Sequence, residues 1–213
     1  MTTARLVPVR TPRDPEGVVV VLHGGASRGE RAVVSPTQLS VLRMVPVARR
    51  IARAGRSRLA VHRLLNSHRG WDARTTPVMD LAWALDRVAE QHGDVPVALV
   101  GHSLGGRAAL LGGNAPHVRS VVALNPWVLP SDRVDLAGRQ VLVVHGTDDR
   151  IALPSRSAEL ARRLATTAQV TYVPVPGGRH AMLRHGRTFE SRAAEFVTGT
   201  LLGSGSRPRA AEG

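Results

Sequence analysis

The chain has 213 residues, of which 43% are hydrophobic, and this suits one globular domain with a substantial core. It has no cysteine, which excludes disulfides, zinc–cysteine sites and a thiol nucleophile. All 29 basic residues are arginines and the net charge is +13, but they are scattered, and one Tyr and two Phe offer little stacking surface. We therefore expect no specific nucleic-acid partner. No apolar run is long enough to span a membrane and no secretory signal is evident, so a cytoplasmic protein is expected.

Short apolar runs alternate along the chain with longer stretches of helical spacing. In chain order we predict strand 18–22, helix 39–54, strand 58–65, helix 77–92, strand 95–100, helix 103–112, strands 118–125 and 140–145, helix 154–166, strand 170–175 and a helix over about 187–201. This order predicts an α/β fold with a mostly parallel sheet of about six to seven strands and helices on both faces. One domain is expected over 1–202. Residues 203–213 are rich in Gly, Ser and Pro, which predicts a disordered tail.

A serine stands at one predicted junction of strand and helix. Gly101-His102-Ser103-Leu104-Gly105 matches the pattern G-x-S-x-G in the context that this motif requires. Such a turn presents the serine hydroxyl as a nucleophile, and the following helix N-terminus favours developing negative charge. Serine is also a good helix N-cap, so the motif alone leaves a structural role open.

Two further strand ends carry the groups that such a serine needs. The run HGTDD places Asp148 and Asp149 after the strand at 140–145, and GGRH places His180 after the strand at 170–175. Parallel strands bring these ends to one edge of the sheet. A carboxylate there can orient a histidine that acts as a general base. Either residue type could be structural by itself, but the three types at three strand ends predict a Ser-His-Asp triad.

An acyl-transfer site also needs donors for the oxyanion of the tetrahedral intermediate. The backbone N–H of Leu104, directly after the serine, is one candidate. The early run LHGGAS would supply the other from Gly25 or Ala26, where neighbouring glycines let the backbone approach closely. A simple glycine turn is the alternative interpretation of this run.

On the motifs HGG, GHSLGG, HGTDD and GGRH, in this order, the chain resembles the α/β-hydrolase family over about residues 17–200. It is most similar to the small esterases, thioesterases and dienelactone-hydrolase-like proteins. The resemblance implies the α/β-hydrolase fold and a triad of Ser103, His180 and Asp149. The family pattern G-x-x-D favours Asp149 over Asp148. Dienelactone hydrolases proper have a cysteine where this chain has Ser103, so that activity is not implied. Residues 126–139 are too few for a cap domain.

Other residues near these strand ends have less specific interpretations. Trp127 could line the pocket or simply pack beneath its loop. Arg69 and Trp71 could contact substrate, or Arg69 could pair with Asp72. We interpret His102 as structural. Three further histidines, His68, His145 and His185, do not form a convincing ligand set, so no metal and no cofactor are expected.

The pattern predicts a serine hydrolase that cleaves ester or thioester bonds of a small acyl substrate through an acyl-enzyme. An acyltransferase or a peptidase could use the same triad, and a non-catalytic ligand-binding homologue could keep the fold. The expected partner is the small acyl substrate, and the sequence does not indicate an oligomeric state.

Overall fold

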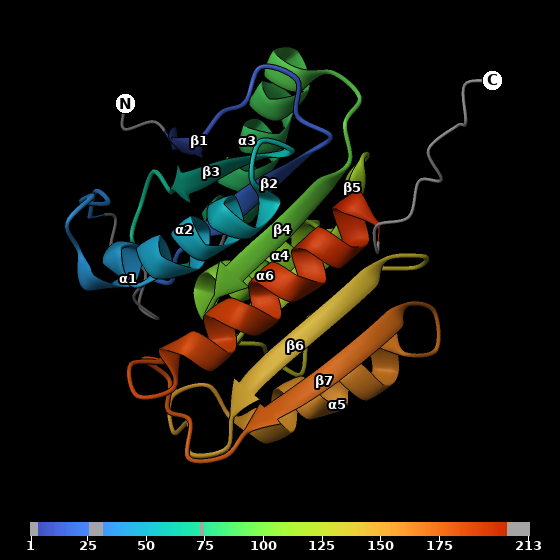
Figure 1. Ribbon diagram of the computed structural model, residues 1–213. Helices are drawn as coiled ribbons and strands as arrows, with labels where there is room; N and C mark the ends of the chain where they lie inside the picture. The colour runs from blue at the N-terminus through green and yellow to red at the C-terminus, as the bar shows by residue number, and fades with distance from the viewer. Residues whose placement is uncertain (1–3, 26–31, 73–74, 204–213) are drawn as a thin grey trace.

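A seven-stranded sheet lies at the centre of the computed structural model, which describes residues 4–25, 32–72 and 75–203 (Figure 1). The strands run in the order β1-β3-β2-β4-β5-β6-β7. Only β1, at one edge, is antiparallel to its neighbour. Their bounds are β1 Arg5–Arg10, β2 Gly17–Leu22, β3 Leu59–Leu65, β4 Val97–His102, β5 Val118–Leu124, β6 Gln140–Gly146 and β7 Gln169–Val175. The predicted mostly parallel α/β-hydrolase sheet is confirmed.

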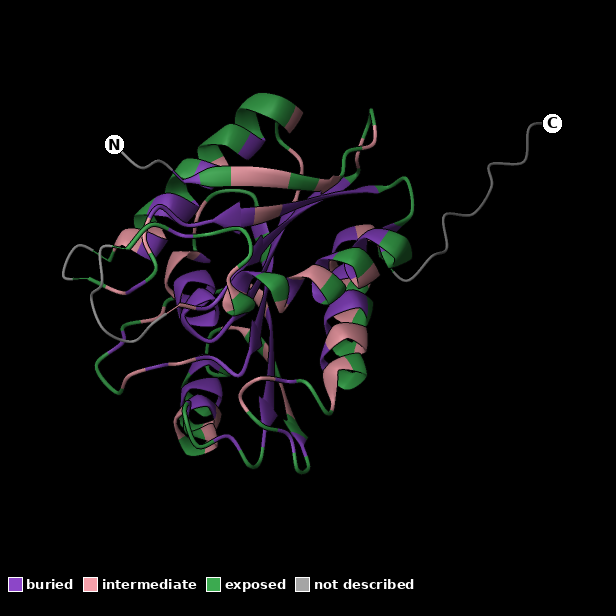
Figure 2. Ribbon diagram, turned by 90° about the vertical axis from the view of Figure 1, so that its left-hand side faces the viewer, coloured by how far each residue is buried: buried purple, intermediate pink, exposed green. Residues whose placement is uncertain are grey.

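Helices cover both faces of the sheet because its central strands are apolar on both sides. In β2 every residue is buried: Val18 and Val20 contribute to the core beneath α3, α4 and α5, whereas Val19 and Val21 face α2 and α6. Figure 2 shows the buried strands between helices whose outer faces are exposed. The helices are α1 Leu39–Leu42, α2 Met44–Gly55, α3 Thr76–His92, α4 Leu104–Gly112, α5 Pro154–Leu164 and α6 Gly186–Leu202.

Apart from shifts of one or two residues at the ends of elements, the structure differs from the sequence prediction at two places. The helix predicted over 39–54 is divided at Arg43 into α1 and α2. Pro46 explains the break, since it has no N–H to donate to the carbonyl of Leu42 and is tolerated only in the first turn of a helix. Strand β1 was not predicted. It contains Pro8, which an edge strand accommodates, and none of its residues is fully buried.

The topology brings the carboxyl ends of β2, β4, β6 and β7 to one edge of the sheet. Residues 125–139 connect β5 to β6 without helix or strand, as expected for a fold without a cap domain. In the described part of the chain, no helix is long and apolar enough to cross a membrane. The predicted tail lies outside the described residues except for Gly203, which follows α6.

Candidate active site

Ser103 occupies a strained turn between β4 and α4. Its backbone has φ 55° and ψ −119°, which L-residues rarely adopt. The turn is possible because the chain passes very close to itself: a Cβ on Gly101 would lie 2.2 Å from the carbonyl oxygen of Gly105. The Ser103 hydroxyl makes no capping hydrogen bond to α4. The turn therefore presents the hydroxyl at the sheet edge. The alternative interpretation, in which the Ser103 side chain caps the helix, does not agree with its hydrogen bonds.

The structure brings Ser103, His180 and Asp149 into one hydrogen-bonded chain. His180 Nε2 lies 2.9 Å from Ser103 Oγ, and His180 Nδ1 lies 2.7 Å from Asp149 Oδ2. Asp149 is 3% exposed, whereas Asp148 is exposed and accepts a hydrogen bond from the Thr147 hydroxyl. Of the two candidate carboxylates, Asp149 is thus the one beside His180. The geometry can hold the proton of His180 on Nδ1 and leave Nε2 free to accept the serine proton.

The Asp149 carboxylate is held by four donors. The backbone N–H groups of Ile151 and Ala152 donate to Oδ1 at 2.8 and 2.9 Å. His145 Nε2 lies 3.4 Å from Oδ2 and also donates to the Ala152 carbonyl at 2.9 Å. Burial alone would raise the pKa of Asp149, but the hydrogen bonds from His145, His180 and the two backbone groups outweigh it and lower this pKa well below its usual value. The carboxylate stays ionised next to His180.

The loop that carries His180 is fixed through its own backbone. His102 Nε2 donates to the His180 carbonyl at 2.8 Å, and Asn125 Nδ2 donates to the same oxygen at 3.2 Å. Asn125 Oδ1 accepts the Gly146 N–H at 2.8 Å, which ties this loop to the turn that holds Asp149. Burial, together with the charge of His180, lowers the pKa of His102 to about 3, so its ring is neutral. His102 and Asn125 therefore act as positioning residues.

The predicted oxyanion donors lie beside the serine. Leu104 is the first residue of α4, where backbone N–H groups lack intrahelical partners. Gly25 follows β2 and lies so close to the next loop that a Cβ there would be 1.9 Å from the Arg69 carbonyl oxygen. His23 supports this turn, since its Nδ1 donates to the Gly24 carbonyl at 2.6 Å while its Nε2 accepts the Asn66 N–H at 3.2 Å. The third candidate, Ala26, lies outside the described residues.

A cavity of about 330 Å³ opens over the serine. Its described lining consists of Gly24, Gly25, Ser40, Arg43, His102, Ser103, Leu104, Trp127, Ile151 and His180. Trp127 thus lines the cavity, as one of its two interpretations proposed. Neither Arg69 nor Trp71 is among these residues. Trp71 instead stacks on Arg107, whose guanidinium lies 4.0 Å from the Trp71 ring centroid.

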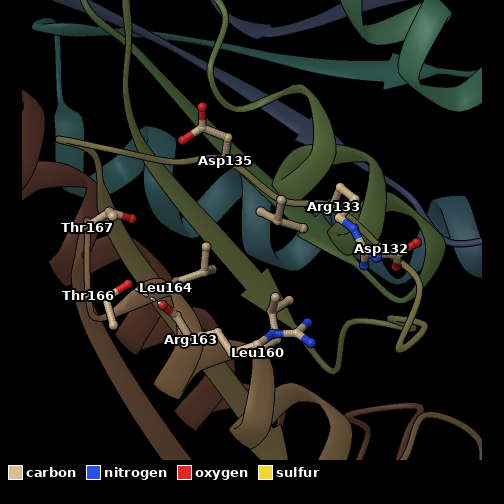
Figure 3. Close-up of a pocket in the computed structure, with 9 residues that line it drawn as sticks. Asp132, Arg133, Asp135, Leu160, Arg163, Leu164, Thr166 and Thr167 are labelled. Atoms are coloured by element: carbon tan, nitrogen blue, oxygen red, sulfur yellow. Dashed lines mark hydrogen bonds between the residues drawn. The ribbon is translucent and has the colours of Figure 1, made fainter.

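A separate hollow of about 470 Å³ lies between α5 and residues 132–135 (Figure 3). Thr166 and Thr167 close one side of it and Arg133 borders the other. It shares no lining residue with the cavity over Ser103. Across the described ranges, no group of three or more His, Asp or Glu side chains is arranged to hold a metal ion.

Sequence reasoning missed three polar residues at this edge: Arg43, Asn125 and His145. Asn125 directly follows β5, so its position at a strand end was a usable signal. His145 lies inside β6, and its role depends on the turn that folds back over it. Arg43 lies on a polar helix face by sequence pattern, and sequence spacing gave no sign that it lines the cavity.

Comparisons with known proteins agree with this architecture. Among solved structures, Est1E from Butyrivibrio proteoclasticus has a TM-score of 0.67 at 14% identity and covers 93% of this chain and 94% of its own. XC6422 from Xanthomonas campestris, an α/β serine hydrolase without a lid, has a TM-score of 0.69 at 18% identity, covering 91% and 87%. An esterase from Pyrobaculum calidifontis has a TM-score of 0.68 at 16% identity, covering 93% and 80%.

These identities show a shared fold and do not by themselves show a shared activity. No curated protein matches the chain in sequence. The family model for serine aminopeptidase, S33, matches residues 13–142, a range that includes Ser103 and ends before Asp149 and His180. The chain therefore belongs to the serine aminopeptidase S33 family of the α/β-hydrolase superfamily.

Proposed function

We propose that this protein is a serine hydrolase that cleaves carboxylic esters or thioesters of small acyl substrates. The observation that carries the proposal is the hydrogen-bonded chain from Ser103 Oγ through His180 to the buried carboxylate of Asp149. The esterases among the structural neighbours support the same reaction class. The described residues form no cap domain over the cavity at Ser103, which suits small substrates that enter directly from solvent.

In the proposed reaction Ser103 Oγ attacks the carbonyl carbon while its proton passes to His180 Nε2. The oxyanion that forms lies against the backbone N–H groups of Leu104 and Gly25. The imidazolium then gives its proton to the departing alcohol or thiol, and the carbonyl reforms as an acyl-enzyme. A water molecule deprotonated by His180 attacks the acyl group next. Collapse of the second intermediate returns the proton to Ser103 and releases the carboxylic acid.

The family name makes an aminopeptidase the main alternative, and the cavity lining disfavours it. An aminopeptidase must bind the positively charged amino terminus of its substrate. The described lining residues include no carboxylate, and they include the cation of Arg43. Like charges in a partly desolvated cavity repel. An ester substrate has no such requirement, so we favour ester over amide cleavage.

Replacing the nucleophile tests the proposal. A fluorophosphonate probe should label the wild-type protein and the Ser131→Ala variant, whose serine is exposed in the β5–β6 connection, but not Ser103→Ala. Hydrolysis of p-nitrophenyl acetate should fall in Ser103→Ala by several orders of magnitude, on the order of 10⁶-fold in well-studied triads. Wild-type-like hydrolysis by Ser103→Ala would refute the assignment. A preference for an aminoacyl p-nitroanilide over the ester would favour the aminopeptidase.

A further inference from the structure

One arginine that lines the catalytic cavity has no acidic partner among the residues that the structure describes. Arg43 lies at the break between α1 and α2 and lines the same cavity as Ser103 and His180. Its charge also contributes to the low pKa of His102, the residue next to the nucleophile. The guanidinium is therefore close enough to the reacting groups to act on them and on a bound substrate.

The environment of Arg43 is that of an incomplete ion pair. Its Nε is buried and has no hydrogen-bond partner, and within the described ranges the side chain forms no ion pair. Burial lowers its pKa, which reflects the cost of removing the charge from water. Arg107 on α4 shows how this fold satisfies a buried guanidinium, since two of its nitrogens contact the Asp132 carboxylate at 2.6 to 3.1 Å. Among the described residues, no acid pairs with Arg43 in this way.

Neither folding nor the proposed chemistry on a neutral ester accounts for this arrangement. An unpaired, partly buried cation costs stability. A positive charge near His180 also opposes formation of the imidazolium during acyl transfer. Both costs disappear when the substrate itself brings a negative charge to Arg43.

We propose that Arg43 is a specificity-determining residue that binds a carboxylate on the acyl or alcohol part of the substrate. This inference rests on the proposed ester hydrolysis and adds the substrate class, esters that carry a carboxylate. The planar, permanently charged guanidinium matches a carboxylate through two parallel hydrogen bonds, and Arg43 lines the cavity in which the substrate would lie.

The test compares pairs of esters that differ in charge but little in shape. One pair, 3-acetoxybenzoate and 3-acetoxybenzamide, places the charge on the leaving group. The other, the p-nitrophenyl half-ester of adipic acid and p-nitrophenyl hexanoate, places it on the acyl group. For each pair the ratio of kcat/KM, anionic over neutral ester, is measured in the wild-type protein, Arg43→Gln, Arg43→Lys and Arg53→Gln. Arg53 is the charge-matched control, because it is exposed near the far end of α2.

We expect the wild-type protein to prefer the anionic ester in at least one pair. Arg43→Gln should reduce that ratio by about 10- to 100-fold, the range for losing a hydrogen bond to a charged group. Arg43→Lys should restore part of it, and Arg53→Gln should leave it unchanged. Hydrolysis of neutral esters with no Arg43-dependent preference in either pair would overturn this inference but not the proposed function. Absence of hydrolysis of all four esters would overturn both.

Discussion

Replacement of Asp149 by asparagine is the most informative perturbation of the site, because it removes the charge and keeps the shape. The backbone N–H groups of Ile151 and Ala152 hold Oδ1 of the aspartate at 2.8 and 2.9 Å. These two N–H groups would hold the amide oxygen of the asparagine in the same place, because in the flipped orientation the amide NH₂, a donor, would face these two donors instead. The amide NH₂ would then face His180 Nδ1, where the aspartate has an acceptor 2.7 Å away.

This change reverses the tautomer of His180. With a donor facing it, Nδ1 must accept a hydrogen bond, so the ring proton moves to Nε2 and faces the Ser103 hydroxyl. Nε2 can then no longer take the serine proton. The same substitution in a well-studied serine protease lowers kcat by about 10⁴-fold, equivalent to about 5 kcal/mol of transition-state stabilisation. We expect a loss of that size here, because the two backbone donors at Oδ1 outweigh the single, more distant donor His145 Nε2 at Oδ2 and so favour this orientation of the amide.

The assay is kcat/KM for p-nitrophenyl acetate at about pH 8, with the rate of fluorophosphonate labelling as a second measure of serine reactivity. Asp148→Asn is the matched control, since Asp148 is adjacent and exposed, and its side chain accepts a hydrogen bond from the Thr147 hydroxyl. Both readouts should fall steeply in Asp149→Asn and change little in Asp148→Asn. Equal losses in the two variants, or a near-normal rate in Asp149→Asn with the fold intact, would refute the argument from the tautomer.

Two further predictions concern the support of the site. The buried pair of Arg107 and Asp132 should behave as a unit: Arg107→Met and Asp132→Leu should each lower the free energy of unfolding by about 3–5 kcal/mol, because each leaves one buried charge uncompensated, and the double variant should lose less than their sum. Additive losses in urea unfolding would contradict this coupling. His102, with a pKa near 3 when folded and 6.5 when unfolded, should make the protein progressively less stable as pH falls below about 6.5, by up to about 1.4 kcal/mol per pH unit. His102→Gln keeps a donor for the His180 carbonyl without titrating, so its stability should fall less between about pH 6 and 4, and equal pH slopes in urea unfolding would contradict this assignment.

The sheet could be predicted from the sequence because its signals are local. In β2 and β4 an unbroken apolar run indicates burial on both faces, and the glycines after each run mark where the strand ends. Strand β1 carries no comparable signal. Its residues are exposed or half-buried and its Pro8 argues against a strand, so only pairing with β3 defines it. The break at Arg43 also had a local cause in Pro46, although helical periodicity on both sides concealed it.

Ser103, Asp149 and His180 could be predicted because each lies within five residues of the end of its own strand and parallel strands bring their ends together. No comparable rule of position along the chain predicts the other residues of the site. Asn125 and His145 act through backbone groups of turns whose conformations depend on the whole fold. The roles of these two side chains follow from their contacts in the folded protein, and sequence spacing does not predict those contacts.

The sequence gives the number of charged residues, whereas only the structure shows which of them are paired. With 29 arginines, composition suggests only a diffuse positive surface and distinguishes no single position. The structure distinguishes two by their partners. Arg107 is paired with Asp132 and stacks on Trp71, so its charge is satisfied within the protein. Arg43 is partly removed from water and unmatched by any described acid, so its charge is available to whatever occupies the cavity. An arginine can bind an anionic substrate only where its charge is not already paired within the protein. Among the described residues that line the cavity at Ser103, we infer that Arg43 is such an arginine.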